Sequence, residues 1–215
     1  MSFTKTAIKW KVLLCGMGIT ICMSSSAMAY SRTAAINYSD QYAMSPNPSY
    51  EYYAGNDCAN FVSQCFYTGG LNKSGTWYTY YNSDGEMCGT SAWVNADALK
   101  NYVKGLNATR LGNWSKYGTS GQYSTYAYVN NSANLTSANT GKTVVFYDWT
   151  GDGEMDHSSI FVANNAKTYN TDADGNVTGD LISQHSNNRR RVIWNRDKAN
   201  RQRNTTRIYA FELPV

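Results

Sequence analysis

The hydrophobic pattern predicts three helices in the part of the chain that follows residue 30. In DCANFVSQCFYTGG, apolar residues recur at i, i+3, i+4, i+7 and i+8 counted from Cys58, which places them on one helical face. Asn56 or Asp57 can cap the start of this helix, and Gly69-Gly70 closes its end. Similar spacing occurs in YSRTAAINYSDQYAM, which stops before SPNP, and in SAWVNADALKNYVKGL.

After Gly141 the pattern changes to short runs rich in β-branched and aromatic residues. These runs are KTVVFYDW, SSIFVAN, DLISQHS and TRIYAFEL, and Gly, Asp and Asn separate them. Helices followed by a mostly antiparallel sheet predict the α+β class. Residues 106–140 are polar, and both long loops and substrate-facing insertions remain open for them.

The first 29 residues have the features of a secretory signal peptide. Three lysines precede an apolar run from Val12 to about Met23, and Ala27 and Ala29 form an A-x-A cleavage pattern. We therefore expect Tyr30 to begin the mature protein, with residues 30–215 forming a single domain. The expected location is secreted or extracellular, with association with the cell wall left open, and no membrane contact is expected after cleavage.

The charge is uneven only near the C-terminal end. Three of the 19 Lys and Arg residues precede residue 30, so the rest of the chain is nearly balanced by its 15 Asp and Glu residues. The stretch NRRRVIWNRDKANRQRNTTR is strongly basic. It is either a docking patch for an anionic wall polymer or a solvated, salt-bridged surface segment, and we favour the second interpretation. No nucleic-acid partner is expected.

Three cysteines follow the predicted signal peptide, and their odd number leaves at least one thiol free. Three arrangements remain open: Cys58 pairs with Cys88, Cys65 pairs with Cys88, or all three cysteines are free. A thiol in the first turn of a helix faces unsatisfied N–H groups, which stabilise a thiolate. Cys58 is therefore a candidate nucleophile, and Cys65, two turns further on, is expected to fill the core.

The two histidines lie in consecutive predicted strands. His157 opens one strand and His185 ends the next, with the turn-forming stretch YNTDADGNV between them. In a hairpin centred near residue 171, His185 or Asn187 lies across from His157. A tight turn at Asp174-Gly175 would instead place His157 near Val192. A cysteine, a histidine and a third polar residue are the groups that nucleophilic cysteine catalysis needs.

The segments NDCANFVSQCFYTGG, VVFYDWTGDGEMDHSSIFV and LISQHSNNRR resemble the putative amidase domain family, which is grouped with papain-like cell-wall hydrolases of the NlpC and CHAP types. The resemblance implies a papain-like fold and a cysteine amidase or peptidase that acts on peptidoglycan stem peptides. By position, Cys58 is the nucleophile, His157 the general base and His185 the third catalytic residue. Asn187 or Gln184 is the alternative third residue.

The same resemblance suggests how the oxyanion is stabilised. The backbone N–H of Cys58 stands at a helix start and is a natural donor to the oxyanion. The second donor is the side chain of Asn56 or one of the upstream tyrosines, Tyr50, Tyr52 and Tyr53.

Two other function classes remain open from the sequence. One is a catalytically silent module that binds the cell wall, and the other is a cysteine acyl or amine transferase. No cofactor or metal is expected, because the chain has neither C-x-x-C nor H-E-x-x-H, and its Asp-rich stretches fit turns better than calcium loops. We expect a monomer whose partner is a peptide or peptidoglycan substrate.

Overall fold

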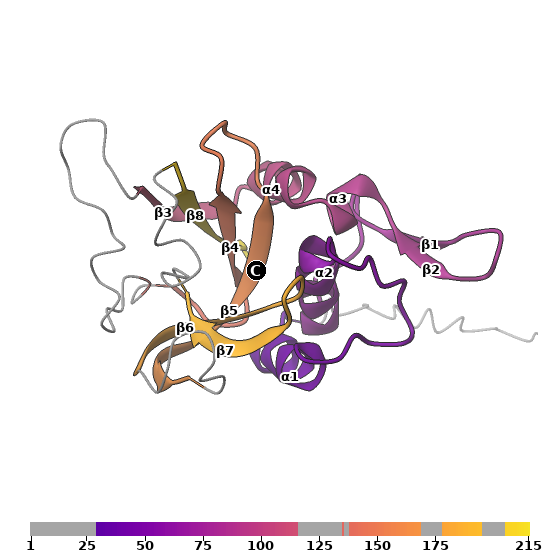
Figure 1. Ribbon diagram of the computed structural model, residues 1–215. Helices are drawn as coiled ribbons and strands as arrows, with labels where there is room; N and C mark the ends of the chain where they lie inside the picture. The colour runs from indigo at the N-terminus through magenta and orange to yellow at the C-terminus, as the bar shows by residue number, and fades with distance from the viewer. Residues whose placement is uncertain (1–28, 116–134, 136–137, 169–177, 195–204) are drawn as a thin grey trace, which may run out of the picture.

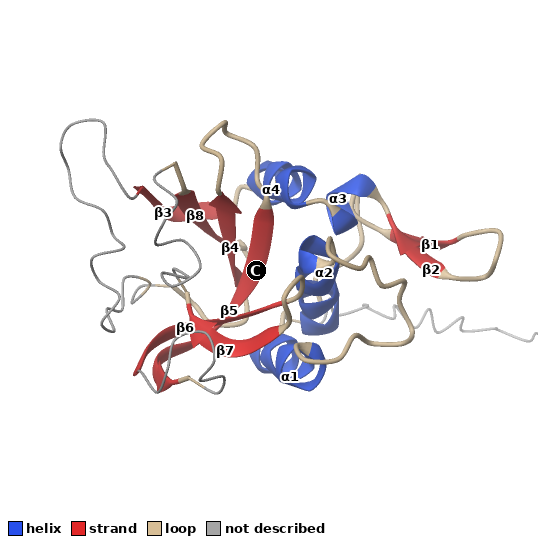
Figure 2. Cartoon of the chain, viewed as in Figure 1, coloured by secondary structure: helices blue, strands red, loops and turns tan. Residues whose placement is uncertain are grey.

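The computed structural model describes residues 29–115, 135, 138–168, 178–194 and 205–215. Helices come first in the described chain and most strands follow, as Figures 1 and 2 show. The helices are α1 (Arg32–Tyr42), α2 (Cys58–Gly69), α3 (Ser91–Val94) and α4 (Ala96–Gly105). The strands are β1 (Thr79–Tyr81), β2 (Met87–Gly89), β3 (Thr109–Ser115), β4 (Thr143–Asp148), β5 (His157–Lys167), β6 (Thr178–Gln184), β7 (Arg189–Ile193) and β8 (Arg207–Glu212).

The main sheet has six strands in the order β3-β8-β4-β5-β6-β7, and each neighbouring pair is antiparallel. The expected α+β class with an antiparallel sheet is therefore confirmed. All six residues of β4 are buried, which fits its continuous apolar run at the centre of the sheet. Helix α2 packs against β5, and α1 lies beside α2 at the end of the sheet that carries β7 (Figure 1).

Local sequence signals set the ends of α1 and α2. The Ser31 hydroxyl accepts a hydrogen bond from Ala34 N–H (3.2 Å) and caps the start of α1. Asp57 precedes α2, and Gly70 ends it in the left-handed conformation with φ of 104°. Both helices occupy the segments predicted from the sequence.

Helix α2 is buried on its polar side as well as on its apolar stripe. The predicted stripe, Phe61 included, is enclosed, and so are Asn60, Ser63 and Gln64. These polar side chains are all hydrogen-bonded: Asn60 Oδ1 accepts from Trp93 Nε1 (2.9 Å), Ser63 Oγ donates to the Trp93 carbonyl (2.8 Å), and Gln64 Oε1 accepts from the Tyr38 hydroxyl (2.6 Å). The helix is thereby fixed from both sides.

The third predicted helix was wrong in one respect, because it is two helices. Asn95 is extended, with φ of −111° and ψ of 132°, and it separates α3 from α4. Its side chain accepts a hydrogen bond from Ala98 N–H (2.9 Å) and caps α4. An N-cap residue cannot also continue the preceding helix, and this explains the break.

The four strands predicted after Gly141 are confirmed, and the sequence pattern missed two others in the main sheet. Strand β3 lies at the start of the polar region that had no assignment, and β7 lies within the basic stretch. In β7, Arg191 forms a bidentate pair with Asp40, at 2.8 Å from Nε and 2.6 Å from Nη2. Arg191 is therefore salt-bridged as expected, but this part of the stretch is not a solvated segment, because Val192, Ile193 and Trp194 are buried.

The described cysteines, Cys58, Cys65 and Cys88, are all free thiols. Cys65 is fully buried among apolar side chains, which confirms its expected place in the core. None of the helices formed by the described residues is long and apolar enough to cross a membrane. Most of the predicted signal peptide, the middle of the polar region and residues 195–204 of the basic stretch lie outside the described residues.

Candidate active site

Cys58 is the first residue of α2 and stands at the wall of a cleft of about 590 Å³. Its side chain is mostly covered, with 5% of the residue exposed. The cleft lies between the start of α2, the α3–α4 junction and the loop that joins β4 to β5. Its lining residues are Tyr53, Asn56, Cys58, Val94, Asn95, Ala96, Asp97, Asp152, Glu154, Met155 and Asp156.

His157 is the first residue of β5, directly after the cleft-lining Asp156. It is 2% exposed. The indole of Trp149 stacks on its imidazole, with ring centroids 5.2 Å apart and planes 16° from parallel. The ring of Tyr147, opposite it on β4, lies 5.5 Å away. These aromatic contacts restrict the rotation of the imidazole and keep water from its faces.

Ser158 connects the Cys58 thiol to the strand that begins at His157. Burial raises the pKa of Cys58, while the main chain and hydroxyl of Ser158 and the main chain of Ala59 act to lower it. The nearby charge of Asp57 raises it further. The expectation of a depressed thiol pKa at a helix start is therefore wrong, since burial outweighs the helix-terminal N–H groups.

The hydrogen bonds of His185 run to the start of α2 and to the end of α1. Its Nδ1 lies 2.5 Å from Asp57 Oδ2, and its Nε2 donates to the Tyr42 carbonyl (2.7 Å). The imidazole also stacks on Phe61 of α2, with centroids 4.2 Å apart. Both ring nitrogens are thus occupied by groups other than His157.

Asp57 is the centre of this arrangement, and the sequence had marked it only as a helix cap. Its Oδ1 accepts from Tyr53 N–H (3.0 Å) and from Asn60 Nδ2 (2.8 Å), while its own N–H donates to Ser186 Oγ (2.8 Å). Asp57 is 1% exposed. The sequence did contain a signal for this role: an aspartate stands directly before the candidate nucleophile, and the chain has a second histidine that could pair with it.

The hairpin of β5 and β6 is confirmed, but its register differs from both arrangements considered. Ile160 pairs with Ser183. Continued to the start of β5, this register places Ser186 across from His157, and it places Gln184 on the same face of the sheet as His157. Bulges in β5 shift the pairing, so the sequence alone had no fixed midpoint. Asn187 is exposed in the following turn, with φ of 71°.

The predicted oxyanion donors separate clearly. Asn56 lines the cleft together with Cys58, and so does Tyr53, whose hydroxyl accepts from Gly89 N–H (3.3 Å). Tyr50 instead stacks on Trp93, and Tyr52 meets the edge of His185. No group in the described part of the chain accepts a hydrogen bond from Cys58 N–H, because the helical bonds begin with Phe61 N–H to the Asp57 carbonyl.

The sequence of residues 29–209 matches the family model described as a putative amidase domain. The chain belongs to the putative amidase domain family. It is 31% identical over 172 residues to the uncharacterized protein YjcM of Bacillus subtilis, covering 79% of this chain and 34% of that protein. It is 27% identical over 163 residues to YhbB of the same organism, covering 67% of this chain and 43% of that protein.

The chain therefore spans less than half the length of these two relatives, and both carry names that assign no activity. No solved structure shows significant similarity to the chain. The family membership supports a hydrolase in general terms. The residues that carry out the reaction must be argued from this site.

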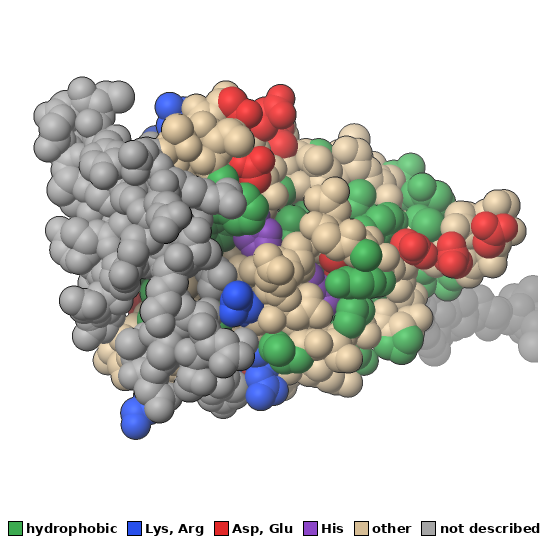
Figure 3. All heavy atoms as spheres, viewed as in Figure 1, with side chains coloured by type: hydrophobic (Ala, Val, Ile, Leu, Met, Phe, Trp, Pro, Cys, Tyr) green, Lys and Arg blue, Asp and Glu red, His purple; other side chains and the backbone are tan. Residues whose placement is uncertain are grey.

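The amidase-family cleft has an acidic rim formed by the loop between β4 and β5. Asp148 organises the loop: its carboxylate accepts from Gly151 N–H (2.5 Å) and Gly153 N–H (3.0 Å), and it is fully buried. Asp152, Glu154 and Asp156 project from the loop around the cleft. Figure 3 shows acidic side chains gathered above the histidines on this face.

These contacts account for the Asp-rich DWTGDGEMD stretch as a turn, in agreement with the sequence interpretation. Among the described residues, no group of three or more His, Cys, Asp and Glu side chains is arranged to hold a metal ion. The groups in and beside the cleft are the Cys58 thiol, the His157 imidazole, backbone donors and the carboxylates of the rim.

Proposed function

We propose that this chain is a secreted cysteine amidase or peptidase that hydrolyses amide bonds in peptidoglycan stem peptides. The observation that carries the proposal is the place of Cys58: a helix-start thiol lines a cleft together with Asp156, the residue directly before His157. Membership of the putative amidase domain family supports the reaction type. The likeness to wall hydrolases supports the substrate and the papain-like fold.

The first step is attack by sulfur. His157 takes the proton from the Cys58 thiol as Sγ forms a bond to the amide carbonyl carbon, and the carbonyl π electrons move to oxygen. Burial raises the pKa of Cys58, so the proton passes to His157 as sulfur attacks the carbonyl. The N–H of Cys58 and the side chain of Asn56 or Tyr53 donate to the oxyanion.

The second half of the reaction restores the thiol. The tetrahedral intermediate expels the amine, which receives the proton held by His157, and leaves a thioester on Cys58. His157 then removes a proton from water, which attacks the thioester carbonyl. Release of the carboxylic acid returns the proton to sulfur, so the net reaction is amide hydrolysis.

In this account His185 is a positioning residue. Its contacts with Asp57 and with the Tyr42 carbonyl hold the segment that precedes Cys58. Trp149 holds the imidazole of His157 by stacking. Gln184, which the register places on the face of His157, is the polar side chain of β6 that best fits the third role.

The test is digestion of purified peptidoglycan by the wild type, Cys58→Ala and Cys65→Ala, with newly released amino groups measured. Cys65 is the matched control because it lies on the same helix and is fully buried. We expect Cys58→Ala to lose at least about a thousandfold in rate and Cys65→Ala to remain active. Equal rates for Cys58→Ala and the wild type would refute the assignment.

The same experiment separates the rival functions. A transferase would form a new amide when an amine is added and would release little free acid. A silent binding module would retain the wall polymer in a pull-down without releasing amino groups from it. Either outcome would replace hydrolysis as the function of the cleft.

A further inference from the structure

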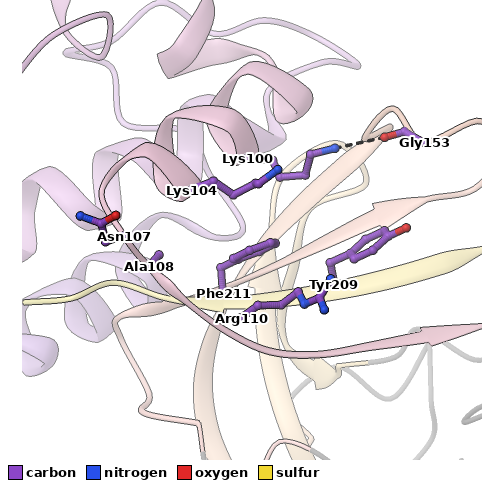
Figure 4. Close-up of a pocket in the computed structure, with 8 residues that line it drawn as sticks. All are labelled: Lys100, Lys104, Asn107, Ala108, Arg110, Gly153, Tyr209 and Phe211. Carbon is purple, nitrogen blue, oxygen red and sulfur yellow. Dashed lines mark hydrogen bonds between the residues drawn. The ribbon is translucent and has the colours of Figure 1, made fainter.

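A second cavity lies on the other side of α4 from Cys58, between that helix and the strands β3 and β8. Its volume is about 560 Å³. Figure 4 shows Lys100 and Lys104 on the helix above the rings of Phe211 and Tyr209, with Arg110 along the strand below. The remaining lining residues are Asn107, Ala108 and Gly153.

The charged side chains among the described residues that line this cavity are all positive. Lys104 and Arg110 are exposed, and neither forms an ion pair or a hydrogen bond with any residue in the described part of the chain. Phe211 is 5% exposed and supplies an apolar floor. A hollow with two uncommitted cations above an aromatic surface suits a ligand with an anionic group and an apolar portion.

The basic cavity lies next to the Cys58 cleft, and the contacts of Lys100 separate the two. Lys100 Nζ donates to Asp97 Oδ1 (2.8 Å) and to the Gly153 carbonyl (3.1 Å). Asp97 lines the Cys58 cleft and also accepts from Met155 N–H (3.3 Å), whereas Lys100 and Gly153 line the basic cavity. A ligand that leaves the cleft over α4 therefore reaches the basic cavity next.

We infer that the basic cavity is a subsite for a carboxylate of the substrate, on the assumption that the Cys58 cleft is the amidase site proposed above. The cleft is rimmed by Asp97, Asp152, Glu154 and Asp156, and the adjoining cavity by three cations. A peptide with a carboxylate beyond its scissile amide complements this polarity. A peptide whose carboxylate is replaced by a carboxamide loses the interaction with Lys104 and Arg110.

Direct binding tests the subsite without relying on catalysis. The full chain with Cys58→Ala is titrated with N-acetylalanine and, separately, with N-acetylalaninamide, and the amide resonances of Asn107, Ala108 and Arg110 are followed by NMR. We expect saturable shifts with the acid, and at least about tenfold weaker binding of the acid in Lys104→Gln/Arg110→Gln, the equivalent of about 1.4 kcal/mol. The control is Arg32→Gln/Lys167→Gln, which removes the same charge from α1 and from the far end of β5.

Equal binding of acid and amide, or an unchanged affinity in Lys104→Gln/Arg110→Gln, would overturn the subsite. So would saturation by inorganic phosphate with no response to the acid, because the cavity would then be a phosphate site. Peptidoglycan digestion separates this failure from that of the proposed function. If only the subsite proposal is wrong, digestion by the wild type still depends on Cys58. If only the amidase proposal is wrong, the NMR titration still shows a preference for the acid.

Discussion

Asp57 Oδ2 and His185 Nδ1 lie 2.5 Å apart and join the start of α2 to the end of β6. On the other side of the ring, His185 Nε2 donates to the Tyr42 carbonyl, so one imidazole joins the residue before Cys58 to the last residue of α1. Both side chains are 1% exposed. The pair therefore acts as a buried clamp on the segment that presents Cys58.

Asp57→Asn should destabilise the protein by about 3 kcal/mol, because an amide has one oxygen and cannot replace both carboxylate oxygens, which serve His185 on one side and the Tyr53 and Asn60 donors on the other. The cost of the double variant Asp57→Asn/His185→Gln should be smaller than the sum of the two single costs by about 1–3 kcal/mol. Such a shortfall is the signature of a direct pair. Urea unfolding measures both quantities. Asp40→Asn is the control: its pair with Arg191 is partly exposed and should contribute only about 1 kcal/mol or less.

A positioning role for His185 also predicts a kinetic effect. At a temperature where His185→Gln is fully folded, its rate of peptidoglycan digestion should fall while the alkylation rate of Cys88 stays constant. Digestion at the wild-type rate by folded His185→Gln would limit the clamp to stability.

Ser158→Ala should make the Cys58 thiolate harder to form, because the Ser158 hydroxyl acts to lower the pKa of that thiol. Alkylation of Cys58 by iodoacetamide at pH 8 should slow, and its pH midpoint should move upward. Ser159→Ala is the matched control, since the Ser159 hydroxyl donates to Tyr147 (3.1 Å) and does not act on Cys58. An equal change in both variants would show a general disturbance of β5.

The protein should lose stability in alkali. Burial raises the pKa of Cys58 and raises that of Cys65 well above its ordinary value, so the folded state holds protons that the unfolded state releases. The stabilisation is complete below the unfolded thiol pKa of about 8.5 and declines above it, with a slope approaching about 1.4 kcal/mol per pH unit for each group. Urea unfolding at pH 7.5 and 9.5 measures the decline, and Cys65→Ala should reduce it. Equal stability at the two pH values would contradict this account.

Gly69→Ala should cost about 1–3 kcal/mol through overpacking. A Cβ at this position would stand 2.6 Å from the ring of Tyr30. That ring cannot shift freely, because its hydroxyl donates to the Gly141 carbonyl (2.6 Å). Gly105→Ala, also at the end of a helix, has no atom within 4 Å and should change stability by less than about 0.5 kcal/mol. A similar cost at both sites in urea unfolding would remove the role of Tyr30.

Local signals in the sequence were enough to predict the frame of the fold. The stripe from Cys58 to Phe66, the closing glycines and the apolar run of β4 each depend on neighbouring residues, and each was predicted correctly. The break at Asn95 and the strand β7 were missed. The local composition around Asn95 is that of a helix interior, although its side chain caps a new helix. The local composition of β7 is that of a solvated loop, because the strand is rich in arginine.

The candidate site was predicted only in part, because its contacts join distant segments. Cys58 and His157 were marked by residue type and by the family resemblance. The partners of His185 are Asp57 and Tyr42, which lie 128 and 143 positions away in the sequence, so no local pattern reports them. The raised pKa of Cys58 depends on burial, which no local pattern reports.

The central claim is that Cys58 is the nucleophile, and the most direct test relates its modification to activity. The protein is treated with iodoacetamide for increasing times, and the labelled fractions of Cys58 and Cys88 are measured by mass spectrometry alongside peptidoglycan digestion. We predict that activity falls in proportion to the fraction of Cys58 labelled and is independent of Cys88. Full activity in protein whose Cys58 is completely alkylated would contradict the account.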